Sequence, residues 1–243
     1  MAISIKGDPY DFPYDGNLRP EKTAFVIVDM QVDYLQPGGY FDAMGYDIAP
    51  MRAAIEPTRR ALAAAREAGL HVIFVREGYR ADLADLPEVV RWRSKRVGAE
   101  IGGPGPYGRF MIRGEKGAEI TPELRPLPGE PIIDKSATNG FYATDLDFVL
   151  THRGISSMVF AGITTDVCVH STLRAAADRG YDCMLLRDCT AATLHENYLA
   201  SLSMIQQEGG FFGTIGSSAD FVSSLTSLAS QGRAKRQTAT AAV

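Results

Sequence analysis

Residues 157–177 read S-M-V-F-A-G-I-T-T-D-V-C-V-H-S-T-L-R-A-A-A, and this stretch decides the fold. The run from Met158 to Ala161 is apolar and has the length of a buried strand, and apolar residues then recur at helical spacing. Thr165 and Asp166 are residue types that cap the start of a helix. The pattern therefore predicts a buried strand that is followed directly by a helix.

Cys168 falls in the first turn of that predicted helix. Unpaired backbone N–H groups and the positive end of the helix dipole favour a thiolate there, which predicts a thiol pKa below the ordinary value of about 8.5. Most free cysteines, however, are small buried apolar side chains. Position alone leaves both interpretations open, a nucleophile or a core residue.

The composition is that of an ordinary soluble protein, with 243 residues, 45% hydrophobic and 22% charged, and a net charge of -4. A single α/β domain of this length can bury a large core. The charge gives no general attraction for nucleic acid or for an anionic membrane, so we expect small molecules or copies of the same chain as partners. Three cysteines, with neither a signal peptide nor a long apolar run, predict a reduced, cytoplasmic compartment.

Further apolar runs alternate with helical patterns along the chain. We expect strands at 23–29, 70–76, 131–135, 157–162, 183–187 and 211–215. Because hairpin signals are absent, this alternation predicts a parallel sheet that is covered by helices on both faces. The predicted organisation is an irregular N-terminal arm (1–22), one hydrolase domain (23–229) and a disordered tail (230–243). The aromatic residues of the arm are expected to pack on the body or on another subunit.

The segment 77–117 is long, charged and interrupted by Pro and Gly, which is typical of a loop that covers a site or contacts a second subunit. Residues 103–108 match G-x-G-x-x-G, but they follow no predicted strand and contain prolines. A dinucleotide site is therefore not predicted, and we expect no cofactor.

Asp29, Lys135 and Cys168 each follow a predicted strand. In a parallel sheet the carboxyl ends of the strands form the ligand crevice, so the three side chains are expected to meet. A thiolate can attack a carbonyl carbon, a carboxylate can take the thiol proton and return it to a leaving amine, and an ammonium can hold both charges. This chemistry predicts an amide hydrolase. The alternatives without a catalytic role are that Asp29 is a carboxylate that caps a turn and that Lys135 is a solvated surface lysine.

Histidine chemistry is less favoured. His170 lies about 200° around the helix from Cys168, so it cannot act as the base of that thiol. The other three histidines are isolated in the sequence, and His, Cys and Asp residues do not occur at metal-ligand spacing. We therefore expect no metal.

Three motifs carry a resemblance to a known family: V-I-V-D-M-Q (26–31), I-I-D-K (132–135) and G-I-T-T-D-V-C-V (162–169). They resemble the isochorismatase-like cysteine hydrolases, which include nicotinamidases, N-carbamoylsarcosine amidases and ureidoacrylate amidohydrolases. The resemblance covers residues 23–225. It implies a three-layer, Rossmann-like α/β sandwich with a six-stranded parallel sheet, and a catalytic triad of Asp29, Lys135 and Cys168.

The same resemblance implies a non-proline cis peptide bond between Ile163 and Thr164. It also implies an oxyanion hole that is formed by the backbone N–H groups of Thr164 and Cys168. Within the family, the pattern of residues 76–87, R-E-G-Y-R-A-D-L-A-D-L-P, looks most like the biuret hydrolases. The nicotinamidases carry an acid and two histidines for a metal soon after the second strand. No Asp-x-His pair follows Val75 here, which argues against nicotinamide as substrate.

We therefore expect a cysteine amidohydrolase that releases ammonia from a small ureide, such as biuret, triuret or guanylurea, through a thioester on Cys168. Family resemblance favours a homo-oligomer, specifically a tetramer. Substrate contacts are expected from Tyr34, Trp92, Phe141, Thr164 and Glu208. Glu208 stands where the biuret hydrolases look to have a glutamine, so a substrate rich in N–H donors is expected.

Two alternatives stay open. A ureidoacrylate or other N-carbamoyl amidohydrolase would need a cation for the substrate carboxylate, which Arg76, Arg80 or Arg91 could supply. A catalytically silent, oligomeric binding module would have no chemical reason to keep all three triad residues.

Overall fold

A six-stranded sheet forms the centre of the computed structural model, which describes residues 3–240, with the backbone alone for 231–240. The strand order is β5-β2-β1-β6-β7-β8, and every pair is parallel. The strands are β1 (Thr23–Val28), β2 (His71–Glu77), β5 (Ile132–Lys135), β6 (Ser157–Ile163), β7 (Asp182–Ala191) and β8 (Thr214–Gly216). The predicted fold class is confirmed.

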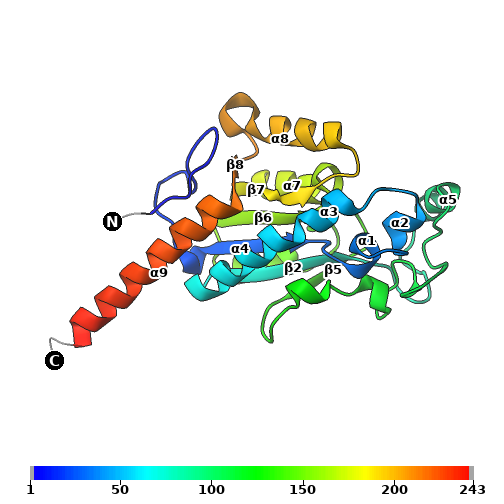
Figure 1. Cartoon of the computed structure of the whole chain (residues 1–243), viewed down its shortest axis with the longest axis horizontal. Coiled ribbons are helices and arrows are strands. Elements are labelled where there is room, and N and C mark those ends of the chain that lie inside the picture. Colours follow the sequence, from blue (N-terminus) through cyan, green and yellow to red (C-terminus); the bar gives the residue numbers. More distant parts are fainter. Residues whose placement is uncertain (1–2, 241–243) are drawn as a thin grey trace.

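Helices cover both faces of the sheet (Figure 1). Residues of α4 and α9 belong to the apolar core on one face, and residues of α6, α7 and α8 belong to the core on the other. The long helices are α4 (Ile55–Ala68), α8 (His195–Gly210) and α9 (Ser218–Thr240); shorter ones are α1 (Val32–Leu35), α2 (Tyr40–Ala43), α3 (Ala49–Ala53), α5 (Glu88–Arg96), α6 (Leu146–His152) and α7 (His170–Ala177). The three-layer sandwich that the resemblance implied is therefore present.

Strand β1 is buried along its whole length because it lies in the middle of the sheet. Phe25 and Ile27 join the core on the α4 side, whereas Ala24, Val26 and Val28 join the core on the α7 side. Alternate residues of a strand point to opposite faces, so a continuous apolar run is what a strand between two helical layers needs. Asp29 follows immediately, at the carboxyl edge.

Gly162 allows the end of β6 to approach β1 closely. Its φ is 120°, and a Cβ atom built on it would lie 2.0 Å from the carbonyl oxygen of Val28. A side chain at this position would push the two strands apart directly before Asp29 and Thr164. The glycine therefore sets the spacing of the two strand ends that lead into the site.

The predicted arm packs on its own chain, and the predicted tail continues a helix. Ile5 and Phe12 of the arm are fully buried, and the Tyr10 hydroxyl donates a 2.9 Å hydrogen bond to Asp182. The prediction of a disordered tail from Ser230 differs from the structure, in which the backbone of α9 continues to Thr240. Good helix formers extend a helix that is already nucleated. Residues 241–243 lie outside the described part of the chain.

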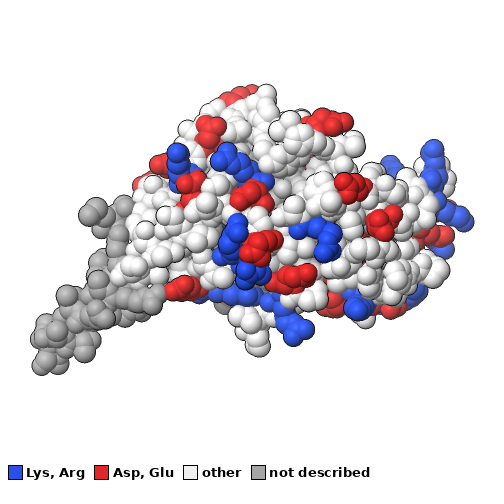
Figure 2. All heavy atoms as spheres, viewed as in Figure 1, with Lys and Arg blue, Asp and Glu red and all other residues white. Residues whose placement is uncertain are grey.

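Basic and acidic side chains are interspersed over the face shown in Figure 2, in keeping with the small net charge. Over residues 3–240, no helix combines the length and the apolar character that a membrane span requires. The two short strands β3 (Pro104–Gly105) and β4 (Gly108–Arg109) form an antiparallel ladder over the G-x-G-x-x-G match, so these glycines do not begin a helix.

Candidate active site

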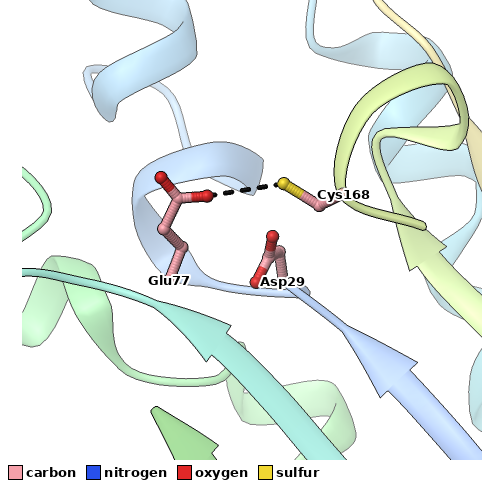
Figure 3. Close-up of side chains that lie close together, drawn as sticks. All are labelled: Asp29, Glu77 and Cys168. Carbon is pink, nitrogen blue, oxygen red and sulfur yellow. Dashed lines mark hydrogen bonds between the residues drawn. The ribbon is translucent and has the colours of Figure 1, made fainter. Parts of the chain in front are cut away.

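Four neighbouring strands each end in one polar side chain of a single cluster. In sheet order these are Lys135 at the end of β5, Glu77 at the end of β2, Asp29 after β1 and Cys168 in the turn after β6. Figure 3 shows Asp29, Glu77 and Cys168 pointing toward one another. The structure thus brings together the three predicted residues and adds Glu77, which the sequence analysis missed.

The Lys135 ammonium lies among the three other groups. Its Nζ atom is 2.8 Å from Asp29 Oδ2, 2.9 Å from Glu77 Oε2 and 3.4 Å from Cys168 Sγ. Burial alone would lower the pKa of Lys135, but the carboxylates of Asp29 and Glu77, together with the Cys168 sulfur, raise it well above its usual value. The lysine is therefore a fixed positive charge.

Glu77 is held by both its backbone and its side chain. The Gln31 amide donates to the Glu77 carbonyl oxygen at 2.7 Å, and its oxygen accepts from the Glu77 N–H at 2.8 Å. The Tyr79 hydroxyl donates to Oε1 at 3.5 Å, while Oε2 faces Lys135 and Cys168. Its place as the last residue of β2 is the signal that could have revealed it, because the same criterion predicts Asp29 and Lys135.

Cys168 lies in a π-helical turn, Thr165–Val169, that continues into α7. Neither predicted cap forms: the Thr165 hydroxyl pairs with that of Thr190, and Asp166 accepts from Asn197. The Sγ atom donates to Glu77 Oε2 at 3.4 Å.

The prediction of a lowered thiol pKa for Cys168 is wrong. Burial raises this pKa well above its usual value, Lys135 opposes the shift, and the charges of Asp29 and Glu77 add to it. The resting nucleophile is therefore a thiol, and it needs a base. Burial also raises the pKa of Asp29, to about 6, against the attraction of Lys135. A carboxylate with a pKa near neutrality is well matched to accept and return a proton.

Two cavities adjoin this cluster. The inner one has a volume of about 200 Å³ and is lined by Asp29, Glu77 and Cys168 together with the aromatic side chains of Tyr34, Tyr40 and Phe41. Tyr34 and Thr164, two of the expected substrate contacts, line it as well. The expected cis peptide bond between Ile163 and Thr164 is present.

The outer cavity is larger, about 780 Å³, and shares Glu77 and Thr138 with the inner one. Residues of the segment 77–117, including Arg93 and Arg113, form much of its wall. The Arg113 guanidinium donates to Ser136 at 2.7 Å and lies 3.2 Å from Asp85, yet its buried Nε has no partner in residues 3–240. The expectation that the segment covers the site agrees with this placement.

Three expected substrate contacts lie away from the inner cavity and need correction. Phe141 is buried against Tyr181, at 6.4 Å between ring centroids, and Arg179 covers its ring. Trp92 is 55% exposed on α5 and stacks with Arg96. Glu208 is exposed at the kink near the end of α8, which leads into the amino end of β8 and so lies at the opposite edge of the sheet.

The arginines proposed for a substrate carboxylate need correction too. Arg76 pairs with Asp134 and Glu119, Arg80 with Asp82, and Arg91 with Glu100. None of them lines either cavity within the described chain, because their guanidinium groups are engaged at the surface.

Asp29, Glu77 and Cys168 also form the one group, within the part of the chain that the structure describes, whose ligand atoms lie close enough to hold a metal ion, all within 4.8 Å. Lys135 Nζ, however, contacts each of these three residues. Its ammonium already supplies the positive charge that a cation would bring, so these residues fit a metal poorly.

The comparisons with known proteins agree with this geometry. A sequence profile described as the isochorismatase domain matches residues 23–218. The ureidoacrylate amidohydrolase RutB of Agrobacterium fabrum is 35% identical over 207 residues, covering 84% of this chain and 90% of that protein. RutB of Caulobacter segnis is 33% identical over 231 residues, covering 94% of each.

Two solved structures are similar as well. The cysteine hydrolase of Pseudomonas syringae pv. phaseolicola has a TM-score of 0.74 at 26% identity, with 87% of this chain and 95% of that chain covered. The N-carbamoylsarcosine amidase of Thermoplasma acidophilum has a TM-score of 0.62 at 27% identity, with 81% and 96% covered.

Fold and site together define a hydrolase with a three-layer α/β sandwich and a buried cluster of cysteine, lysine and carboxylates at the carboxyl edge of its sheet. The chain belongs to the isochorismatase family, and it is an amidohydrolase of that family.

Proposed function

We propose that this protein hydrolyses the terminal C–N bond of a small ureide and releases ammonia through a thioester on Cys168. The observation that carries the proposal is the contact of one fully buried ammonium, Lys135, with both Asp29 and the Cys168 sulfur beside a small cavity. Such a cluster offers a nucleophile, a base and a fixed countercharge within hydrogen-bond reach.

The first half of the reaction uses Asp29. Cys168 Sγ attacks the carbonyl carbon while its proton passes to the Asp29 carboxylate, which is why a pKa near 6 is useful there. The backbone N–H groups of Thr164 and Cys168 stabilise the oxyanion in this proposal, supported by the position of both residues in the cavity wall. The C–N bond then breaks, and Asp29 returns the proton to the departing amine.

A carboxylate-bearing ureide of the ureidoacrylate kind is the substrate class that we favour. The outer cavity supports this choice, because Arg113 Nε is buried without a partner and the Arg93 guanidinium forms no ion pair with any residue in the described range. Guanidinium groups bind carboxylates in a forked geometry. The names of the relatives in Agrobacterium and Caulobacter point the same way.

Neutral or cationic ureides, such as biuret, triuret and guanylurea, are the second candidate. Asp85, Asp134 and Glu77 also line the outer cavity, and carboxylates accept hydrogen bonds from N–H donors. This preference no longer draws support from Glu208, which lies elsewhere.

Ammonia release from ureidoacrylate, N-carbamoyl-β-alanine, biuret, triuret and guanylurea tests the proposal. We expect the two carboxylated compounds to have the higher kcat/KM. Neutral ureides at the head of the ranking would favour the second candidate, and no ammonia from any of the five would support the silent binding module.

We also retain the proposal of a homo-oligomer. Tyr14 is 79% exposed and Trp92 is 55% exposed, and aromatic side chains of this kind are enriched in interface cores. A monomer in light scattering at micromolar concentration would rule it out.

A further inference from the structure

Glu77 stands between the two cavities and touches the nucleophile. It lines both the inner and the outer cavity, and its Oε2 atom lies 3.4 Å from Cys168 Sγ. Its side chain is 14% exposed, whereas that of Asp29 is 1% exposed. The two carboxylates share Lys135 but differ in their access to solvent.

Hydrolysis through a thioester has two halves, and each needs a base. Asp29 serves the first half, in which the thiol loses its proton. In the second half a water molecule must reach the thioester carbon, and the larger outer cavity adjoins the inner one at Glu77 and Thr138. Water that enters from this side meets the Glu77 carboxylate within reach of the acylated sulfur.

We propose that Glu77 is a fourth catalytic residue, the base of thioester hydrolysis; this rests on the thioester of the proposed function. The water oxygen bonds to the thioester carbon as its proton moves to Glu77 Oε2. The C–S bond then breaks, and the acid leaves the cavity. Glu77 passes its proton to the Cys168 thiolate across the 3.4 Å contact, which restores the resting thiol.

The contacts of Glu77 hold its carboxylate in a fixed position beside Cys168, as a general base requires. Gln31 clamps its backbone, Lys135 orients Oε2 at 2.9 Å, and the Tyr79 hydroxyl occupies Oε1. A carboxylate that served only to neutralise Lys135 would have no need to contact the sulfur or to line the outer cavity. Asp29 already provides a fully buried countercharge at 2.8 Å.

Burst kinetics with p-nitrophenyl acetate separate the two halves, since nitrophenolate reports acylation and steady turnover reports deacylation. In Glu77→Gln we expect a burst in which about one nitrophenolate is released per subunit, and this burst should depend on Cys168. Steady turnover should then fall by about 10²-fold or more, the scale of general base catalysis. Acetylated Cys168 should accumulate in intact-mass spectra, and hydroxylamine, which attacks thioesters without a base, should restore turnover. Asp29→Asn should instead slow the burst itself.

Glu119→Gln is the matched control, because Glu119 is an exposed carboxylate that pairs with Arg76 outside both cavities. If Glu77→Gln slows burst and turnover equally, or leaves both unchanged, or is not rescued by hydroxylamine, Glu77 is not the deacylation base. The proposed function fails separately: a wild-type enzyme that turns over the ester but no ureide would refute the substrate and leave the role of Glu77 standing.

Discussion

The inner and outer cavities adjoin each other, but they are built from different parts of the chain. The inner cavity takes its charged groups from the ends of sheet strands, where Asp29 and Cys168 are buried and held by parallel pairing. The outer cavity takes much of its wall from the segment 77–117, with exposed or half-buried side chains such as Arg93 and Arg113. From this difference we expect the strand ends to carry out the reaction and the segment 77–117 to select the substrate.

Cys168→Ser tests the inner cavity most severely. We expect kcat/KM to fall by roughly 10⁴-fold or more, the scale on which removal of a triad nucleophile acts, with substrate binding retained. Iodoacetamide should label Cys168 before Cys183 and Cys189, which are buried and line neither cavity. Full activity in the variant would refute the role of Cys168 as the nucleophile. Faster labelling of Cys183 or Cys189 would contradict the expectation that Cys168 is the most reactive of the three thiols.

Lys135→Met should destabilise the fold as well as abolish turnover. It leaves Asp29 and Glu77 without their shared cation, and breaking a buried ion pair costs about 3–5 kcal/mol in unfolding free energy. The deficit should shrink at pH 5, because the pKa of Asp29 is raised to about 6 and its protonated carboxyl group needs no countercharge. Urea unfolding at pH 7 and pH 5 measures it, with the exposed Lys6→Met as control. An equal deficit at both pH values would contradict the electrostatic account.

Arg113→Gln separates the outer cavity from the inner one. We expect KM for ureidoacrylate to rise about 10- to 100-fold, the scale of a lost charge-assisted hydrogen bond, with little change for biuret. Arg59→Gln, on the exposed face of α4, should change neither value. If KM rises equally for both substrates, Arg113 maintains the structure of the segment 77–117 and does not select the substrate carboxylate.

The pH dependence of kcat/KM should report the protonation of Asp29, the proposed base. Because its pKa is raised to about 6, kcat/KM should fall about tenfold per pH unit below that value, where the base is protonated. The same shift acts on stability with the opposite sign. A carboxyl group that binds its proton more tightly when folded favours the native state at low pH, and this contribution is lost as pH rises from about 4 to about 6. A rate that stays flat between pH 5 and 7 would exclude Asp29 as the base.

The sequence predicts the inner cavity better than the outer one for a physical reason. Strand periodicity and polar strand ends are local signals, so the sequence alone places Asp29, Lys135 and Cys168 on one edge of the sheet. Glu77 obeys the same rule, but it falls in the predicted loop because the apolar run ends before it. The side-chain contacts of Arg113 with Ser136 and of Phe141 with Tyr181 depend on tertiary packing, which no local pattern encodes.

Chelation should have the smallest effect of all. The Lys135 ammonium lies 2.8 to 3.4 Å from the three side chains that could otherwise hold a metal ion, and a cation placed among them would be repelled by it. We therefore expect unchanged kcat and KM after exhaustive dialysis against EDTA. Zinc added afterwards should inhibit if it acts at all, because it must displace the ammonium from Cys168 and Asp29. Activity that is lost with the chelator and recovered with zinc would show that the site works as a metal centre and that Lys135 has another role.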